Sequence, residues 1–218
     1  LVNQSTQTLP FETRKNIRII ALSHSGRFLI AVDLDGHAVF FNLARQIILC
    51  RFNFKQSIRS IQFSPNDEHF AVTYRLGCQI WQTPSATREF SPLTLKRSIT
   101  GFSDETVCLD WSSDSQSLIV ASKDLSARVY YKVCSKRMAT TVLSGHRDQL
   151  RGAFFSKENE CVYTVAKDGG IFTWKWEQQP ETIAIEDSKN NEKKARYHKS
   201  NPRHLNDESD DDVSHEDT

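Results

Sequence analysis

The apolar positions of this 218-residue chain come in short runs that recur four times with the same polar punctuation. Each run ends in a large apolar residue, then a serine, then a polar turn; the serines are Ser23, Ser64, Ser112 and Ser156. Their separations are 41, 48 and 44 residues. Self-similarity at about 40–45 residues, with short strands and turn chemistry, is typical of β-propeller blades. The pattern therefore favours a surface for recognition over a catalytic centre.

Each repeat continues with a second apolar run of strand length, rich in β-formers. These runs are Phe28 to Val32, Phe70 to Thr73, Leu118 to Ala121 and Cys161 to Val165. A second turn follows, and Asp and Gly suit tight hairpins there. Six residues after the turn residues Asp35, Asp124 and Asp168 comes an aromatic: Phe41, Tyr130 and Trp174. The second repeat keeps the aromatic as Trp81 but has Arg75 where the aspartate is expected.

Three hairpin-linked strands and an outer strand, such as Ile47 to Phe52 or Thr140 to Leu143, make a four-stranded blade. We therefore predict an all-β fold: a partial β-propeller of about four antiparallel blades with a disordered charged tail. Residues 1–15 are interpreted as the outer strand and connection of a preceding blade, 16–176 as the four blades and 177–218 as a basic and then acidic linker. Because an open row leaves unpaired edges, we expect the chain to be part of a larger propeller.

Charge is divided unevenly along the chain. Residues 186–218 carry a net charge of −4, so the other residues carry +5. A mildly basic body is compatible with nucleic acid nearby, although ordinary surface charge is the simpler interpretation. The five cysteines contain no C-x-x-C pair and fall mostly on predicted strands, which favours reduced, partly buried thiols in the cytosol or nucleus.

The sequence contains no signature of catalysis. G-x-S-x-G, the phosphate-binding P-loop and H-E-x-x-H are all absent. We accordingly predict no catalytic residue, no cofactor, no metal site and no small-molecule substrate, and a chain with no membrane-spanning segment.

The fourth repeat resembles the WD-repeat family. It alone combines a Gly145-His146 pair with Asp168 in the later turn and Trp174 on the third strand. The resemblance implies a structural hydrogen-bonded network within the blade, formed by His146, Thr164, Asp168 and Trp174. Polar members of such a network are costly to leave unpaired, so the expected role is in stability.

Candidate contact residues are basic and lie on predicted turns or in the long insertion at 83–105, which we expect to form a protruding loop. They are Arg88, Lys96, Arg97, Lys123, Arg147 and Lys167. The alternative for each is a solvated side chain with no partner. Ser209 and Ser214 each precede an acidic residue by three positions, which makes them candidate sites for an acid-directed kinase.

Several stretches are similar to the periodic tryptophan protein two family of eukaryotic ribosome-assembly factors. They include Thr87 to Phe90, Gly101 to Trp111 and Ser122 to Asp124. The resemblance implies a non-catalytic scaffold in the nucleolar small-subunit processome, supporting processing of precursor ribosomal RNA. It also implies other WD-repeat processome proteins as partners, together with precursor ribosomal RNA and a small nucleolar RNA. The alternatives are a WD-repeat subunit of another complex, such as a vesicle coat or ubiquitin-ligase adaptor, and an enzyme carried on a propeller.

Overall fold

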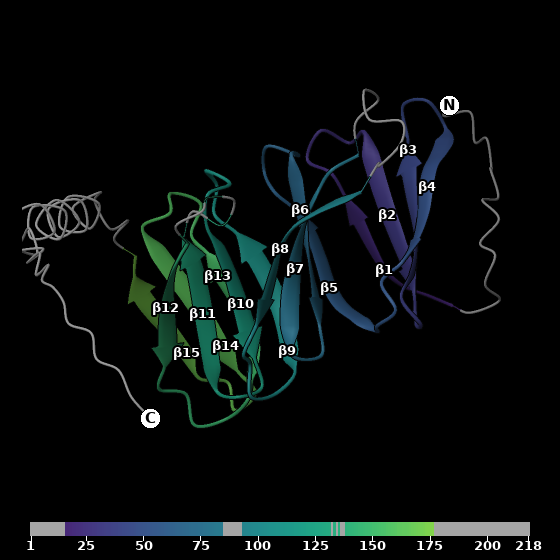
Figure 1. The fold of residues 1–218 in the computed structure, drawn as a ribbon. Helices are drawn as coiled ribbons and strands as arrows, with labels where there is room; N and C mark the ends of the chain where they lie inside the picture. Colours follow the sequence, from purple (N-terminus) through teal and green to yellow (C-terminus); the bar gives the residue numbers. More distant parts are fainter. Residues whose placement is uncertain (1–15, 85–92, 132, 134, 136–137, 177–218) are drawn as a thin grey trace, which may run out of the picture. The chain divides into compact units, whose positions relative to one another are not determined.

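A computed structural model of the chain describes residues 16–84, 93–131, 133, 135 and 138–176, and all regular structure within them is β (Figure 1). Four antiparallel sheets follow one another along the chain, each with its strands in sequence order. Sheet 1 contains β1 (Ile17–Leu22), β2 (Phe28–Asp33), β3 (His37–Asn42) and β4 (Ile47–Asn53). Sheet 2 contains β5 (Ile58–Phe63), β6 (His69–Tyr74), β7 (Gly77–Gln82) and β8 (Thr94–Thr100). Sheet 3 contains β9 (Thr106–Trp111), β10 (Leu118–Ser122), β11 (Ser126–Tyr131) and β12 (Ala139–Ser144). Sheet 4 contains β13 (Leu150–Phe155), β14 (Cys161–Ala166) and β15 (Ile171–Lys175).

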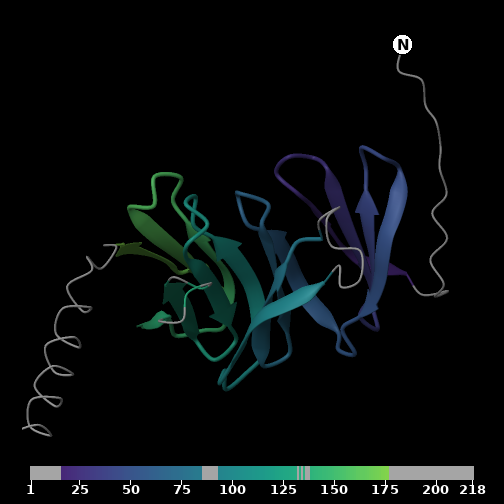
Figure 2. The same cartoon turned by 45° about the horizontal axis from the view of Figure 1, so that its top comes forward.

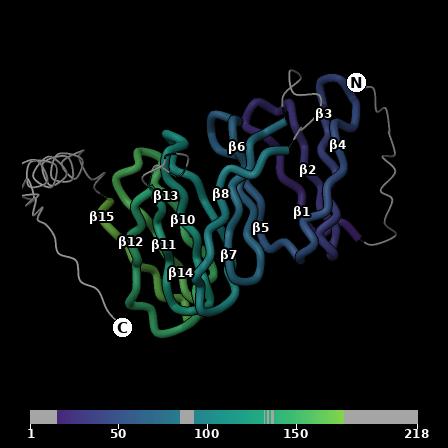
Figure 3. The backbone as a smooth tube through the Cα atoms, in the orientation of Figure 1, coloured from purple at the N-terminus to yellow at the C-terminus, as the bar shows by residue number. Residues whose placement is uncertain are grey.

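The sheets follow one another side by side (Figures 2 and 3). Neighbouring sheets meet along their first strands, since β1 contacts β5, β5 contacts β9 and β9 contacts β13. This is the blade arrangement of a β-propeller, so the predicted fold class is confirmed. Of the four predicted blades, the first three have the expected outer strand. Sheet 4 has three strands within the part of the chain that the structure describes.

The second strands of sheets 2 and 3, β6 and β10, are mostly apolar because a neighbouring sheet covers each of their faces. Successive side chains of a strand point to opposite faces. Ile30 and Val32 of β2 therefore pack toward sheet 2 and meet Phe70 and Val72 of β6, all of them buried. The next junction repeats this contact, with Ala71 of β6 against Leu118 and Val120 of β10. At the last junction Ile119 and Ala121 of β10 pack with Val162 of β14.

The four recurring serines close the turn between the first and second strands. Each Oγ accepts the backbone N–H of the residue five positions later, at 2.8–3.1 Å, and each serine N–H donates to that residue's carbonyl. The residue three positions after each serine has positive φ: Gly26 (68°), Asp67 (58°), Ser115 (61°) and Asn159 (58°). The repeated serine is thus a local device that fixes hairpin geometry.

One segment predicted as a loop contains a strand. The sequence predicts a protruding loop at 83–105, but Thr94–Thr100 forms β8, the outer strand of sheet 2. The strand was missed because its pattern is mostly polar: an outer strand exposes much of its surface, so it needs few apolar residues. The assignments of 1–15 and 177–218 lie outside the described residues, and the domain boundaries remain predictions.

Candidate interaction surface

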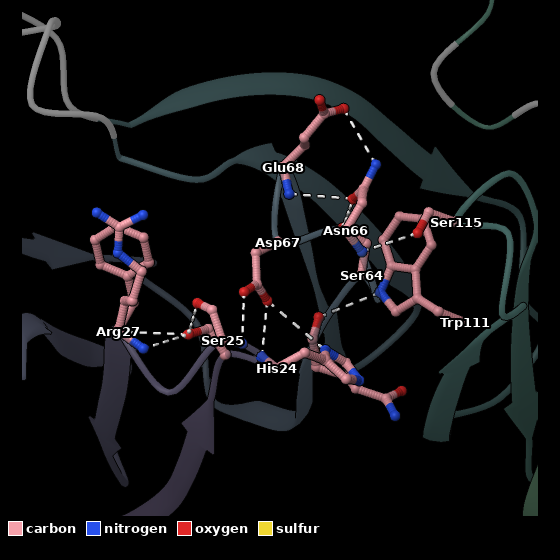
Figure 4. Close-up of polar contacts among 12 residues, drawn as sticks. His24, Ser25, Arg27, Ser64, Asn66, Asp67, Glu68, Trp111 and Ser115 are labelled. Atoms are coloured by element: carbon pink, nitrogen blue, oxygen red, sulfur yellow. Dashed lines mark hydrogen bonds and ion pairs between the residues drawn. The ribbon is translucent and has the colours of Figure 1, made fainter.

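The serine turns are linked from sheet to sheet at one end of the first strands (Figure 4). Asp67, at the positive-φ position of the sheet 2 turn, accepts the backbone N–H groups of His24 and Ser25 in sheet 1, each at 2.8 Å. Partial burial by itself raises the pKa of Asp67, but the hydrogen bonds from Ser25 and His24 outweigh it and the pKa is lowered. The carboxylate is therefore the form that the link stabilises.

The other two junctions use the same position with different chemistry. Ser115 Oγ of sheet 3 accepts the N–H of Asn66 at 3.1 Å, and Asn159 Oδ1 of sheet 4 accepts the N–H of Ser113 at 3.0 Å. A side-chain acceptor in this position therefore bridges every described junction. Sheet 1 has Gly26 here, which satisfies the positive φ but offers no acceptor.

Asp110, the penultimate residue of β9, links three sheets. Its Oδ1 accepts from Gln62 Nε2 of sheet 2 at 3.0 Å, and its Oδ2 accepts from the Phe155 N–H of sheet 4 at 2.9 Å. Burial raises the pKa of Asp110 despite these two donors. Gln62 Oε1 is buried without a hydrogen-bond partner among the described residues. The arrangement is that of a structural bridge.

The structure joins three of the four predicted network residues in sheet 4. Trp174 Nε1 donates to Thr164 Oγ1 at 2.8 Å, and His146 Nε2 lies 2.7 Å from the same oxygen. The His146 ring also stacks on Phe172, with centroids 4.1 Å apart. The fourth residue, Asp168, makes a different hydrogen bond: its Oδ1 accepts the N–H of Gly170 and stabilises the turn between β14 and β15.

At the opposite end of the sheets, each first-strand pairing is interrupted by a β-bulge at the same place. The residues in these positions are Arg18, Arg59, Val107 and Arg151. Bulges redirect side chains and are common next to functional sites. The three arginines are exposed. The turn between the second and third strands adds Arg75, Lys123 and Lys167 at equivalent positions. We call this surface, made of the bulge and turn cations, the bulge end.

One carboxylate of the bulge end is already engaged. Glu105 Oε1 pairs with Arg59 Nη2 at 3.0 Å, and its Oε2 pairs with Lys123 Nζ at 2.7 Å. The hydrogen bond from Lys123, and then the charge of Arg59, lower the pKa of Glu105. A bulge arginine of one sheet and a turn cation of the next thus hold a carboxylate between them.

The predicted contact residues fall into different environments. Lys123 and Lys167 belong to the bulge end, and Arg147 is exposed in the segment before β13. Lys96 is exposed on β8, away from that cluster in the fold, while Arg97 donates to the backbone carbonyl of Ser135 and is half-buried. Arg88, Ser209 and Ser214 lie outside the described residues.

Sequence reasoning missed Asp33, Glu105 and Asp110. Asp33 is buried at the end of β2, where Oδ1 accepts the N–H groups of Asp35 and His37 at 2.9 Å each. The sequence pattern instead indicates Asp35 as the turn aspartate. The sequence does contain a signal for Asp33, which is an acidic residue at the end of an apolar strand. No comparable signal marked Glu105, because its partners come from positions 46 residues before and 18 residues after it.

Other sites are not indicated in the described residues. No group of three or more His, Cys, Asp or Glu side chains there is arranged to hold a metal ion. The described cysteines Cys50, Cys78, Cys108 and Cys161 are free thiols, and burial raises the pKa of Cys50 and of Cys108 to about 11. Within the same residues, no helix has the length and apolar character needed to cross a membrane.

Comparison with known proteins agrees with this geometry. The family "WD domain, G-beta repeat" matches residues 93–130, which contain β8, β9, β10 and all but the last residue of β11. The four antiparallel sheets and this match show an all-β chain that contains a WD repeat.

Three relatives share the name periodic tryptophan protein 2 or its homolog. The chain is 38% identical to that of Schizosaccharomyces pombe over 200 residues, which are 91% of this chain and 23% of the relative. It is 39% identical to that of Saccharomyces cerevisiae over 83% of this chain, and 35% identical to that of Mus musculus over 85%. The chain spans 20–23% of the length of these relatives. It is thus a relative of the periodic tryptophan protein 2 homologues, and the resemblance inferred from sequence is confirmed.

Proposed function

We propose that this chain is a non-catalytic WD-repeat scaffold in the biogenesis of the small ribosomal subunit. In this role it is part of a nucleolar small-subunit processome subcomplex that supports processing of precursor ribosomal RNA. Its partners are other WD-repeat processome proteins, with contact to precursor ribosomal RNA and a small nucleolar RNA. The observation that carries the proposal is the similarity to periodic tryptophan protein 2 homologues over 83–91% of the chain.

The packing between the sheets supports the role of a rigid scaffold. The sheets share buried clusters at each junction, and the first-strand turns are bridged by side-chain acceptors. Loops on such a framework are held in place before a partner arrives, so little conformational entropy is lost on binding. A scaffold of this kind positions partners without chemistry of its own.

The test is affinity purification of the native protein that carries this chain, with identification of bound proteins and crosslinked RNA. A tagged WD-repeat protein from an unrelated complex is the matched control. We expect selective enrichment of precursor ribosomal RNA, a small nucleolar RNA and other processome proteins, with immunofluorescence in the nucleolus. Recovery of vesicle-coat or ubiquitin-ligase subunits, without ribosomal RNA, would contradict the proposal.

A further inference from the structure

The bulge end has a pair of cations at equivalent register positions of two successive junctions. Between sheets 2 and 3 the pair is Arg59 on the bulge and Lys123 in the next sheet's turn, with Glu105 between them. Between sheets 1 and 2 the equivalent pair is Arg18 on the bulge and Arg75 in the turn. Both arginine side chains are exposed.

The two junctions differ in the residue between the cations. Glu105 directly precedes β9, and Ser57 directly precedes β5 at the equivalent position. Strand pairing supports the equivalence, because the following residues pair as Thr106 with Ser122 and as Ile58 with Tyr74. Ser57 is exposed, and its Oγ accepts a hydrogen bond from Arg18 Nη1 at 3.2 Å. A hydroxyl thus stands where the other junction has a carboxylate.

We propose that Arg18, Arg75 and Ser57 form a docking site for a carboxylate supplied by an acidic segment of a partner protein. The partner's Asp or Glu would lie between the two guanidinium groups as Glu105 lies between Arg59 and Lys123. Arginine is suited to this role because its planar fork donates two parallel hydrogen bonds to one carboxylate. Within the described residues, neither Arg18 nor Arg75 has a carboxylate within ion-pairing distance.

The surroundings favour a protein segment as the source of the carboxylate. Leu34 and Leu76 occupy the turns on the two sides of this junction, with 46% and 43% of their surface exposed. Apolar side chains beside a charged pair give a peptide apolar surface to bury, and a phosphate backbone gains nothing from contact with them. The partner segment is accordingly acidic with an apolar residue close to the acid.

Zero-length carbodiimide crosslinking of the native assembly tests the site, because it joins an amine to a carboxylate in direct contact. Lys123 and Glu105, 2.7 Å apart, provide an internal positive control. In the variant R75K we expect a crosslink from position 75 to an Asp or Glu of a partner protein. In S57E/R75K the chain supplies its own carboxylate, so the crosslink should shift to position 57 and the intermolecular product should disappear. S57Q/R75K is the matched control and should retain it.

Binding measurements give a second readout. R18Q and R75Q should each weaken retention of the crosslinked partner by about two- to fivefold, an effect that shrinks as salt rises. R45Q removes an exposed cation from the turn between β3 and β4, and we expect no change. Thermal unfolding of each variant separates loss of the site from loss of the fold.

The proposal is overturned if position 75 couples to nothing, or only to an acid of this chain in the absence of S57E, while the Lys123–Glu105 product forms. Ultraviolet crosslinking of RNA to positions 18 and 75, with no protein carboxylate captured, would also overturn it. The site does not depend on which assembly contains the protein. A partner from another complex would therefore support the docking site while contradicting the proposed function.

Discussion

At the scale of single residues, one hydroxyl can serve two neighbours, and Thr164 is the clearest case. It accepts from Trp174 and lies within hydrogen-bond distance of His146, while being 1% exposed. Removing a buried partner leaves a desolvated polar group, which costs more than the bond itself contributes.

We therefore expect Thr164→Val to lower the free energy of unfolding by about 1–3 kcal/mol. Denaturant titration followed by tryptophan fluorescence measures the change. Thr173→Val, on the exposed part of β15, is the matched control and should change stability by less than about 0.5 kcal/mol. Equal effects of the two variants would contradict a structural role for the network.

The turn serines predict a second effect of a single hydroxyl. Ser112→Ala removes the acceptor for the Ser117 N–H, at 2.8 Å in a buried turn, and should cost about 1–3 kcal/mol. Ser113→Ala, one residue further along and exposed, should be nearly neutral. Hydrogen exchange at Ser117 provides a local readout: its protection should fall in S112A and persist in S113A.

At the scale of strands and turns, stability depends on groups that cross between sheets. Asp110 is the strongest example, since its carboxylate receives donors from β5 and β13. Its raised pKa means that the folded state binds this proton more readily than the unfolded chain. The contribution of Asp110 to stability therefore falls as pH rises from the usual aspartate range through the raised pKa.

Asp110→Asn removes this pH dependence and retains an acceptor for the Phe155 N–H. If the Gln62 side-chain amide flips, its otherwise unpaired Oε1 can accept a hydrogen bond from the side-chain NH₂ group introduced at position 110. We expect the free energy of unfolding of D110N, minus that of the wild type, to be larger at pH 7 than near pH 4, because only the wild type loses stability as pH rises. Asp110→Ala should cost about 1–3 kcal/mol at pH 7. Urea titrations at both pH values decide this, and a difference that does not vary with pH would argue against the buried carboxylate.

At the scale of the whole molecule, sheet 4 has a face that no described sheet covers. In sheets 1 to 3, one position of the second strand is fully buried against the next sheet; its residues are Ile30, Ala71 and Ile119. The equivalent residue of β14 is Tyr163, which is 39% exposed. Phe154 and Ile171 extend the same face at 48% and 65% exposure. Contiguous exposed apolar side chains of this kind mark interaction surfaces.

We expect the isolated 218-residue chain to self-associate through this face and Ile171→Lys to reduce that association. Val142→Lys is the control, because Val142 is 55% exposed on the outer strand of sheet 3. Sedimentation velocity over a concentration series measures the effect. Unchanged association in I171K would show that the face is not responsible.

The sequence alone determined the repeat, because the physics of a blade is local. The serine turn, the apolar second strand and the aromatic on the third strand each act within about 20 residues, so their periodic spacing is visible without coordinates. The outer strand β8 was not predicted, because a strand that exposes much of its surface needs few apolar residues and so has no apolar pattern.

Only the tertiary structure decided which residues meet between sheets. Glu105 lies between Arg59 and Lys123, and Asp110 lies between Gln62 and Phe155, in each case across separations set by packing and not by sequence spacing. Charged side chains carry no periodic pattern of their own, so a bulge arginine looks like any surface arginine until strand pairing places it. The candidate docking site at Arg18, Ser57 and Arg75 follows from that placement alone.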